Sequence, residues 1–196
     1  MKLSTKLFAC FAIMIVIAVL YRFIPLPIGI YGFTPVFAIA VFGGAIFRND
    51  KKLAFTLPLV TLFLSDLIFQ MLYKAGKWNV PGFYDGQLLN YFLIVLTTYV
   101  GFFIKRIKIT NVLIAAVAAP SLFYVLSNFS VWATTALYPK TLLGLQTCYI
   151  AGLPFYFPWS IVSTVVYIGV LFGTFYAIQN LSWQRAHSIS AKNTEI

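Results

Sequence analysis

Charged side chains are scarce in this sequence. Only 9% of its 196 residues are Asp, Glu, Lys or Arg, whereas 61% are apolar and 18% are aromatic. An ordinary soluble domain carries roughly 25% charged residues, so this chain cannot cover a water-exposed surface of its size. Because lipid offers no partners to backbone polar groups, membrane-crossing segments must be helices or a closed barrel. The apolar runs are long and do not alternate with polar residues, which favours helices.

Cysteine, histidine and acidic residues are also few, and this argues against most catalytic and metal-binding chemistry. Cys10 and Cys148 lie inside apolar runs and His187 stands alone near the C-terminus, so no spacing typical of a disulfide or a metal site is present. Asp66 is the only acid within an apolar run, and it has no second ionisable group near it for acid–base or nucleophilic catalysis. We therefore expect no enzymatic activity, no cofactor and no metal.

Basic residues outnumber acidic ones by 14 to 4, and their positions predict a topology rather than a nucleic-acid partner. They are spread through the gaps between apolar runs instead of gathering on one face. Lys and Arg accumulate on the cytoplasmic side of membranes, and both termini are therefore expected in the cytoplasm. With that topology, ten basic residues lie inside: Lys2, Lys6, Arg48, Lys51, Lys52, Lys105, Arg106, Lys108, Arg185 and Lys192. Four lie outside: Arg22, Lys74, Lys77 and Lys140.

Six apolar runs are expected to be membrane-spanning helices. They cover residues 7–24, 34–47, 53–71, 88–104, 112–138 and 159–181. The first run begins like a signal peptide, but Tyr21 to Ile24 follow it where a cleavage site needs small residues, so we interpret it as an uncleaved span. The second is rich in Gly and Ala, which let helices approach closely, and is expected inside the bundle.

The segment between the last two spans, residues 141–158, is apolar and aromatic but is broken by Gly144, Gly152, Pro154 and Pro158. We interpret it as a short interfacial or re-entrant segment. The predicted fold is therefore an all-α, six-helix transmembrane bundle that forms a single domain over residues 1–182. A polar cytoplasmic tail, residues 183–196, follows it.

Polar side chains within the expected spans are concentrated in the outer halves of four helices. Polar groups are costly in lipid and normally face the interior of a bundle, so we expect a cavity that opens to the outside. The residues expected to bind a ligand there are Asp66, Gln70, Asn90, Tyr124, Asn128, Trp132 and Tyr167. Two loops are expected to roof it, a gating loop with Pro25, Pro27 and Gly32 and a second loop with Trp78, Tyr84 and Asp85.

Structural roles compete with these ligand-binding roles. The alternative for Asp66 is a structural hydrogen bond or ion pair between helices. Asn128 and Trp132 are equally compatible with helix packing and with anchoring at the membrane interface. A single carboxylate among amides and aromatic rings suits a neutral or cationic, heteroaromatic ligand. That inference is cancelled if the partner of Asp66 is Arg22 or Lys140 of the chain itself.

Five segments carry a family resemblance: Phe33–Phe47, Leu64–Asp66, Ser127–Trp132, Tyr138–Gly144 and Cys148–Phe155. With them the sequence resembles an uncharacterised family of small bacterial integral membrane proteins, over most of the chain from about residue 22 to residue 173. The resemblance implies no activity, since none is assigned to that family. It implies a bacterial inner membrane as the location.

In architecture the sequence is more distantly similar to the substrate-capture (S) components of energy-coupling-factor transporters. The similarity rests on length, on six expected spans, and on a Pro- and Gly-rich loop followed by a small-residue-rich helix. It implies capture of a small, vitamin-like molecule for uptake, together with a membrane coupling protein and paired ATPases. The alternative is a non-transporting membrane scaffold in envelope assembly, which predicts a filled cavity. The expected partners are therefore the lipid bilayer, a small molecule and a coupling protein, and not nucleic acid.

Overall fold

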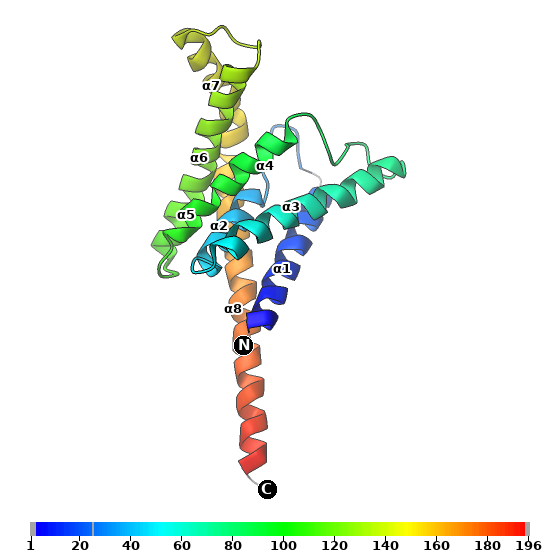
Figure 1. The fold of residues 1–196 in the computed structure, drawn as a ribbon, viewed down its shortest axis with the longest axis vertical. Helices are drawn as coiled ribbons and strands as arrows, with labels where there is room; N and C mark the ends of the chain where they lie inside the picture. Colours follow the sequence, from blue (N-terminus) through cyan, green and yellow to red (C-terminus); the bar gives the residue numbers. More distant parts are fainter. Residues whose placement is uncertain (1–2, 25, 195–196) are drawn as a thin grey trace.

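The computed structural model describes the backbone of residues 3–24 and 26–194, and the side chains of residue 5, residues 8–24 and residues 26–180. Every regular element in this part of the chain is a helix, so the predicted all-α class is confirmed (Figure 1). The elements are α1 (Leu3–Leu20), η1 (Tyr21–Phe23), α2 (Val36–Ile46), α3 (Lys51–Lys74), α4 (Gln87–Leu96), α5 (Thr98–Phe102), α6 (Ile109–Thr134), α7 (Leu142–Tyr156) and α8 (Trp159–Thr194).

Three of the described helices are long and apolar enough to cross a membrane: α3, α6 and the first part of α8, Trp159–Asn180. Three shorter apolar segments, Phe8–Phe23, Val36–Ile46 and Gln87–Phe102, coincide with the other expected spans. This composition is consistent with a membrane protein. The backbone of α8 continues as helix to Thr194, through the segment expected to be a polar tail.

Helix α2 lies at the centre of the bundle, in contact with α3, α5 and α8. Its residues from Phe37 to Gly44 are all buried. Small residues make this position possible, because Gly44 packs directly against the backbone of α5 at Gly101. At 11 residues, α2 is about 17 Å long and could not cross a bilayer core of about 30 Å on its own. The neighbouring helices shield it, as the composition of this segment predicted.

The expected span 88–104 is divided at Thr97 into α4 and α5. The Thr97 hydroxyl donates a hydrogen bond to the Ile94 carbonyl at 2.5 Å, and the Thr97 backbone N–H donates to the same oxygen at 2.9 Å. A threonine hydroxyl that competes for a backbone carbonyl in this way disturbs helical hydrogen bonding. The interruption lets the second half of the segment, α5, pack closely on α2.

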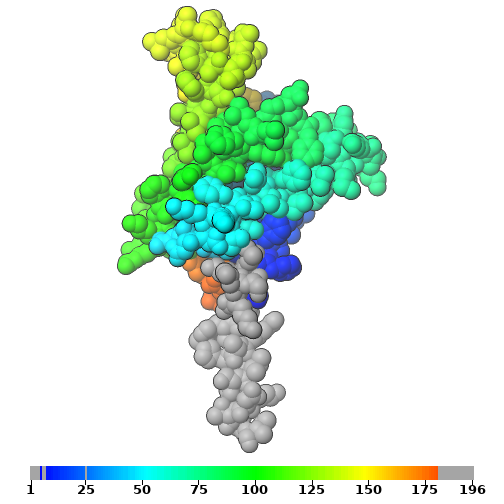
Figure 2. Space-filling model, in the orientation of Figure 1, coloured from blue at the N-terminus to red at the C-terminus, as the bar shows by residue number. Residues whose placement is uncertain are grey.

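Within residues 141–158, which the sequence indicated to be a broken, interfacial or re-entrant segment, Leu142–Tyr156 form the continuous helix α7. Thr141 caps it, since its hydroxyl oxygen accepts a hydrogen bond from the Gly144 N–H at 3.1 Å. Gly144 and Gly152 do not break the helix but lie at close contacts with neighbouring residues. Helix α7 packs along α6, and this hairpin projects from the rest of the molecule (Figure 2).

The loops and turns that connect the helices lie in two groups, one at each end of the molecule. Figure 1 shows the N-terminal end of α1, the α2–α3 turn and the α5–α6 loop at the end from which α8 extends to the C-terminus. The loop after η1, the α3–α4 loop and the α6–α7 turn lie toward the other end. The segments predicted to be cytoplasmic therefore share one end of the fold, and the predicted outer loops share the opposite end.

The contact between α2 and α5 makes a testable prediction. A Cβ on Gly101 would lie 2.3 Å from the Val41 carbonyl oxygen, so we expect Gly101→Ala to destabilise the fold by roughly 1–3 kcal/mol, as overpacking does in other cores. Gly169→Ala is the matched control, because a Cβ there meets nothing within 4 Å and alanine favours a helix. Thermal unfolding in one detergent compares the two, and equal melting temperatures would contradict the tight contact.

Candidate functional site

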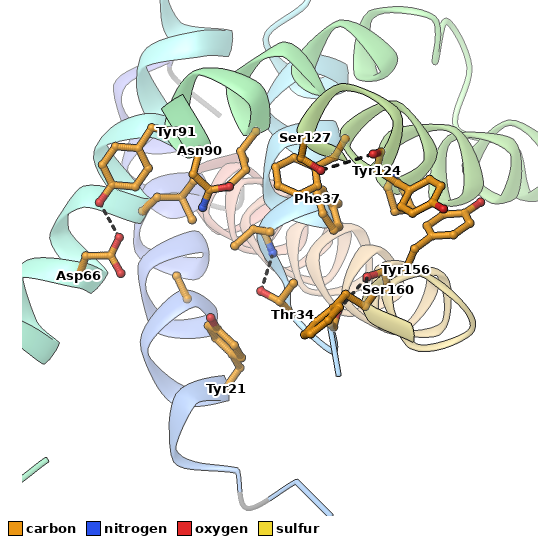
Figure 3. Close-up of a pocket in the computed structure, with 18 of the residues that line it drawn as sticks. Tyr21, Thr34, Phe37, Asp66, Asn90, Tyr91, Tyr124, Ser127, Tyr156 and Ser160 are labelled. Carbon is orange, nitrogen blue, oxygen red and sulfur yellow. Dashed lines mark hydrogen bonds between the residues drawn. The ribbon is translucent and has the colours of Figure 1, made fainter. Parts of the chain in front are cut away.

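A cavity of about 420 Å³ lies between the two halves of the bundle, toward the end with the predicted outer loops. Its wall on one side comes from η1, α3 and α4, and its wall on the other side from α6, α7 and the start of α8 (Figure 3). Phe37 of α2 forms part of the lining between them. A volume of about 300–1,000 Å³ is typical of pockets for small molecules, so this cavity is large enough for a ligand.

The first wall is built around the carboxylate of Asp66, which is 6% exposed. One oxygen, Oδ1, pairs with the Arg22 guanidinium. The other, Oδ2, accepts hydrogen bonds from the Gln87 amide at 2.6 Å and from the Tyr91 hydroxyl at 2.5 Å. Asp66 is therefore matched by one positive charge and two neutral donors. Of the two internal cations considered from sequence, the structure selects Arg22.

The loop between α3 and α4 is attached to this wall by two glutamines. The Gln70 side-chain oxygen accepts hydrogen bonds from the backbone N–H groups of Gly82 and Phe83, at 3.0 and 3.1 Å. The Gln87 side-chain oxygen accepts from the Tyr84 N–H at 3.1 Å. Gly82 lies so close to α3 that a Cβ would be 1.9 Å from the Asp66 carbonyl oxygen. These contacts hold Tyr84 at the edge of the cavity.

The hydroxyl of Tyr84 faces Asn90, whose amide donates a hydrogen bond to it at 2.6 Å. Burial raises the pKa of the Tyr84 hydroxyl, against the opposing effect of this hydrogen bond. The phenol consequently keeps its proton at neutral pH.

The opposite wall comes from the α6–α7 hairpin and includes two tyrosines, Tyr124 and Tyr156. The rings of Tyr124 and Tyr156 are stacked, with centroids 4.7 Å apart and planes 18° apart. The Tyr124 hydroxyl donates to the Tyr149 carbonyl at 2.6 Å, and the Tyr156 hydroxyl lies 2.8 Å from the Ser121 hydroxyl. Asn128 approaches α7 where a glycine leaves room, since a Cβ on Gly152 would lie 2.2 Å from its side-chain oxygen.

The loop that precedes α2 is joined to the α7–α8 region at Gly32. The Ser160 hydroxyl lies 3.1 Å from the Gly32 carbonyl oxygen and 2.7 Å from the Phe155 carbonyl oxygen, and it can donate to either. Gly32 has φ of 74°, and a Cβ there would lie 2.0 Å from the Phe155 carbonyl oxygen. Only glycine meets both conditions at this position.

Four of the predicted ligand-binding residues line the cavity together: Asp66, Asn90, Tyr124 and Asn128. Gly32 from the predicted gating loop and Tyr84 from the second roof loop line it as well. Pro27 does not line it, and neither do Trp78 and Asp85. Pro25 lies outside the described residues.

Three predicted site residues lie elsewhere in the structure. Gln70 supports the α3–α4 loop, as described above. The Trp132 indole N–H donates to the Pro139 carbonyl at 2.9 Å in the α6–α7 turn, and the Lys140 ammonium lies 5.7 Å from its ring centroid. Tyr167 is packed edge-on against the rings of Tyr21 and Phe33. The side chains of all three residues contact other parts of the protein and do not line the cavity.

Several lining residues were not among the predicted site residues, notably Arg22, Tyr91, Tyr156 and Ser160. Tyr91 follows Gln87 by four positions in α4, and both reach Asp66, so this helical spacing is a signal that the sequence contained. Tyr156 lies in residues 141–158, which were interpreted as an interfacial or re-entrant segment and from which no site residue was chosen.

These features define an all-helical protein with membrane-length apolar helices and a polar, aromatic cavity. The chain belongs to a family of unknown function, DUF6580, whose family model matches residues 2–187. The resemblance to an uncharacterised family, expected from sequence segments, is thereby confirmed. No curated protein and no solved structure matches the chain.

The Asp66 ion pair provides a second prediction. We expect Asp66→Asn to destabilise the fold by roughly 2–4 kcal/mol, because removing one member leaves the other without its counter-charge. The lower end allows for the Arg22 side chain, which is 25% exposed. Arg22→Gln is expected to have a similar effect. The double variant is expected to lose less stability than the sum of the two single losses, since the two side-chain amides it carries would be uncharged and could hydrogen-bond to each other.

Asp50→Asn is the matched control for this cycle. Asp50 caps α3 by accepting from the Leu53 N–H at 3.1 Å, and asparagine caps helices equally well. Melting temperatures of the single and double variants give the coupling energy between the two positions. Strictly additive losses at Arg22 and Asp66 would show that the pair does not act as a unit.

Proposed function

We propose that this protein captures a small, uncharged, vitamin-like molecule from the outer side of a bacterial inner membrane. The observation that carries this proposal is the cavity of about 420 Å³, lined by polar and aromatic side chains. It lies toward the predicted outer end of the fold. Intramembrane polar groups that converge on an open space are typical of binding sites, because such groups are otherwise costly in lipid.

The proposed topology has six spans with both termini in the cytoplasm. The three membrane-length helices and the three shorter apolar segments would supply these spans. The turn with Arg48 and Lys51 and the loop with Lys105, Arg106 and Lys108 lie at one end of the molecule, as cytoplasmic segments would. With this orientation the ligand cavity faces outward.

The Arg22–Asp66 ion pair removes the argument for a cationic ligand that an unpaired Asp66 would carry. From sequence, Asp66 alone suited a neutral or a cationic ligand. With Arg22 on Oδ1 and neutral donors on Oδ2, the carboxylate does not need a cation from the ligand. Burying a net charge in a low-dielectric site is expensive without a partner, so a neutral ligand fits best.

The remaining polar groups indicate a ligand with hydrogen-bond acceptors. The Tyr84 hydroxyl oxygen accepts from Asn90, which leaves its proton for another acceptor. The Thr34 hydroxyl oxygen accepts from the Val36 N–H at 3.4 Å, which likewise leaves its proton to donate. Aromatic rings such as Phe37 and Phe123, whose centroids are 5.1 Å apart, add flat apolar surface. A neutral heteroaromatic molecule with a carbonyl or ring nitrogen would use both features.

A capture protein needs a partner that supplies energy for uptake. The architectural similarity to substrate-capture components of energy-coupling-factor transporters supports a membrane coupling protein with paired ATPases in this role. The alternative, a non-transporting scaffold in envelope assembly, predicted a filled interior. The open cavity favours capture.

Affinity purification in mild detergent, with mass spectrometry of bound small molecules and co-purifying proteins, tests the proposal. A stoichiometric neutral ligand, or a coupling protein with its ATPases, is the expected result. An empty chain that co-purifies with envelope-assembly proteins would instead establish the scaffold.

A cavity-filling substitution provides the third prediction. We expect Ser127→Phe to abolish retention of the co-purified ligand, because Ser127 lines the cavity and the added ring occupies the ligand volume. Val125→Phe is the matched control, as Val125 lies on the same helix and its side chain is 49% exposed. Ligand per protein, measured by mass spectrometry after identical purification, decides the outcome. Equal retention by both variants would rule out this cavity as the binding site.

A further inference from the structure

A second hollow, of about 270 Å³, lies between α5 and α6 near the loop that joins them. Its lining is almost entirely apolar. On α6 the lining residues follow one helical face, at Asn111, Ile114, Ala115 and Ala118. Ile114 is 63% exposed and Phe103, on the opposite side of the hollow, is 80% exposed. The hollow is therefore a surface groove rather than an internal packing defect.

The loop between the lining residues Ile104 and Asn111 carries three exposed basic residues, Lys105, Arg106 and Lys108. Asn111, the one polar residue of the lining, donates its amide to the Arg106 carbonyl at 2.8 Å. This hydrogen bond fixes the basic loop against the start of the groove. Asp50, in the α2–α3 turn, caps α3 by accepting a hydrogen bond from the Leu53 N–H.

We propose that this groove binds an anionic phospholipid of the cytoplasmic leaflet. One acyl chain lies in the apolar groove between α5 and α6, and the phosphate headgroup lies against Lys105, Arg106 and Lys108. Two features of the site match such a lipid. The groove is apolar, as an acyl chain is, and the loop at one end is positively charged, opposite in sign to the headgroup. Basic clusters next to grooves between membrane helices on the cytoplasmic side suit such headgroups.

The α5–α6 loop, which lies beside the groove, is at the end of the molecule that carries the N-terminal end of α1 and the α2–α3 turn (Figure 1). Under the proposed topology this end faces the cytoplasm, where an anionic headgroup would meet the basic loop. The inference therefore rests on the membrane placement proposed above, but not on ligand capture in the first cavity. The two sites use different helices apart from α6.

Native mass spectrometry of the full chain in detergent tests this site. The protein is titrated with dioleoyl-phosphatidylglycerol or with dioleoyl-phosphatidylcholine, which share acyl chains and differ in net charge. We expect the anionic lipid to bind at least tenfold more tightly. Lys105→Gln/Arg106→Gln is expected to weaken its binding by roughly fivefold for each charge removed. Ala118→Phe is expected to weaken binding of both lipids, because it fills the groove without changing charge.

Two matched controls make the result specific. Lys51→Gln/Lys52→Gln removes two exposed charges from the other basic turn at the same end, and Val117→Phe adds a ring to an exposed position of α6 outside the groove. Both are expected to bind lipid as the unmodified protein does. If Lys51→Gln/Lys52→Gln weakened binding as much as the test pair, or if Ala118→Phe had no effect, the site would be overturned in favour of general surface attraction. Unchanged small-molecule retention in the Lys105→Gln/Arg106→Gln variant separates this site from the proposed function.

Discussion

A buried carboxylate needs a positive partner and further hydrogen bonds, and Asp66 imposes this requirement on the structure around it. Its partners come from two places far apart in the sequence, Arg22 in η1 and the Gln87–Tyr91 turn of α4. The neighbouring Ser65 hydroxyl adds a bond to the Ala18 carbonyl at 2.8 Å. The end of α1, the middle of α3 and the start of α4 are thereby held at one point. That point is the polar wall of the cavity.

The two walls of the cavity are held by different kinds of interaction. The Asp66 wall depends on an ion pair and charge-assisted hydrogen bonds, which specify geometry strongly because their loss leaves an unmatched charge. The wall from the α6–α7 hairpin depends on stacked tyrosine rings and on hydroxyls bonded to backbone carbonyls, as at Tyr124. These are weaker and neutral contacts. The cavity between the walls therefore has one side that is fixed electrostatically and one side that is shaped mainly by packing.

The sequence identified Asp66 because an acid in an apolar run is rare and demands an internal partner, but it could not choose between Arg22 and Lys140. That choice depends on which loop lies next to Asp66 in the tertiary structure, and the sequence does not show this. The continuity of helix α7 was missed because Gly and Pro usually interrupt helices, whereas here Gly152 provides room for Asn128. For Gln70 and Trp132, polarity predicted an inward or interfacial position. It could not reveal that backbone groups of the α3–α4 loop and the α6–α7 turn already occupy them.

The loop between η1 and α2 connects the two walls of the cavity. At one end Arg22 is paired with Asp66, and at the other the Gly32 carbonyl lies beside the Ser160 hydroxyl. Gly29 and Gly32 both have positive φ, a conformation that favours glycine. Moving this loop would separate Arg22 from Asp66 or Gly32 from Ser160, because the described contacts anchor it at both sides. The loop is therefore attached to both walls of the cavity, by an ion pair at η1 and by a hydroxyl–carbonyl contact at Gly32.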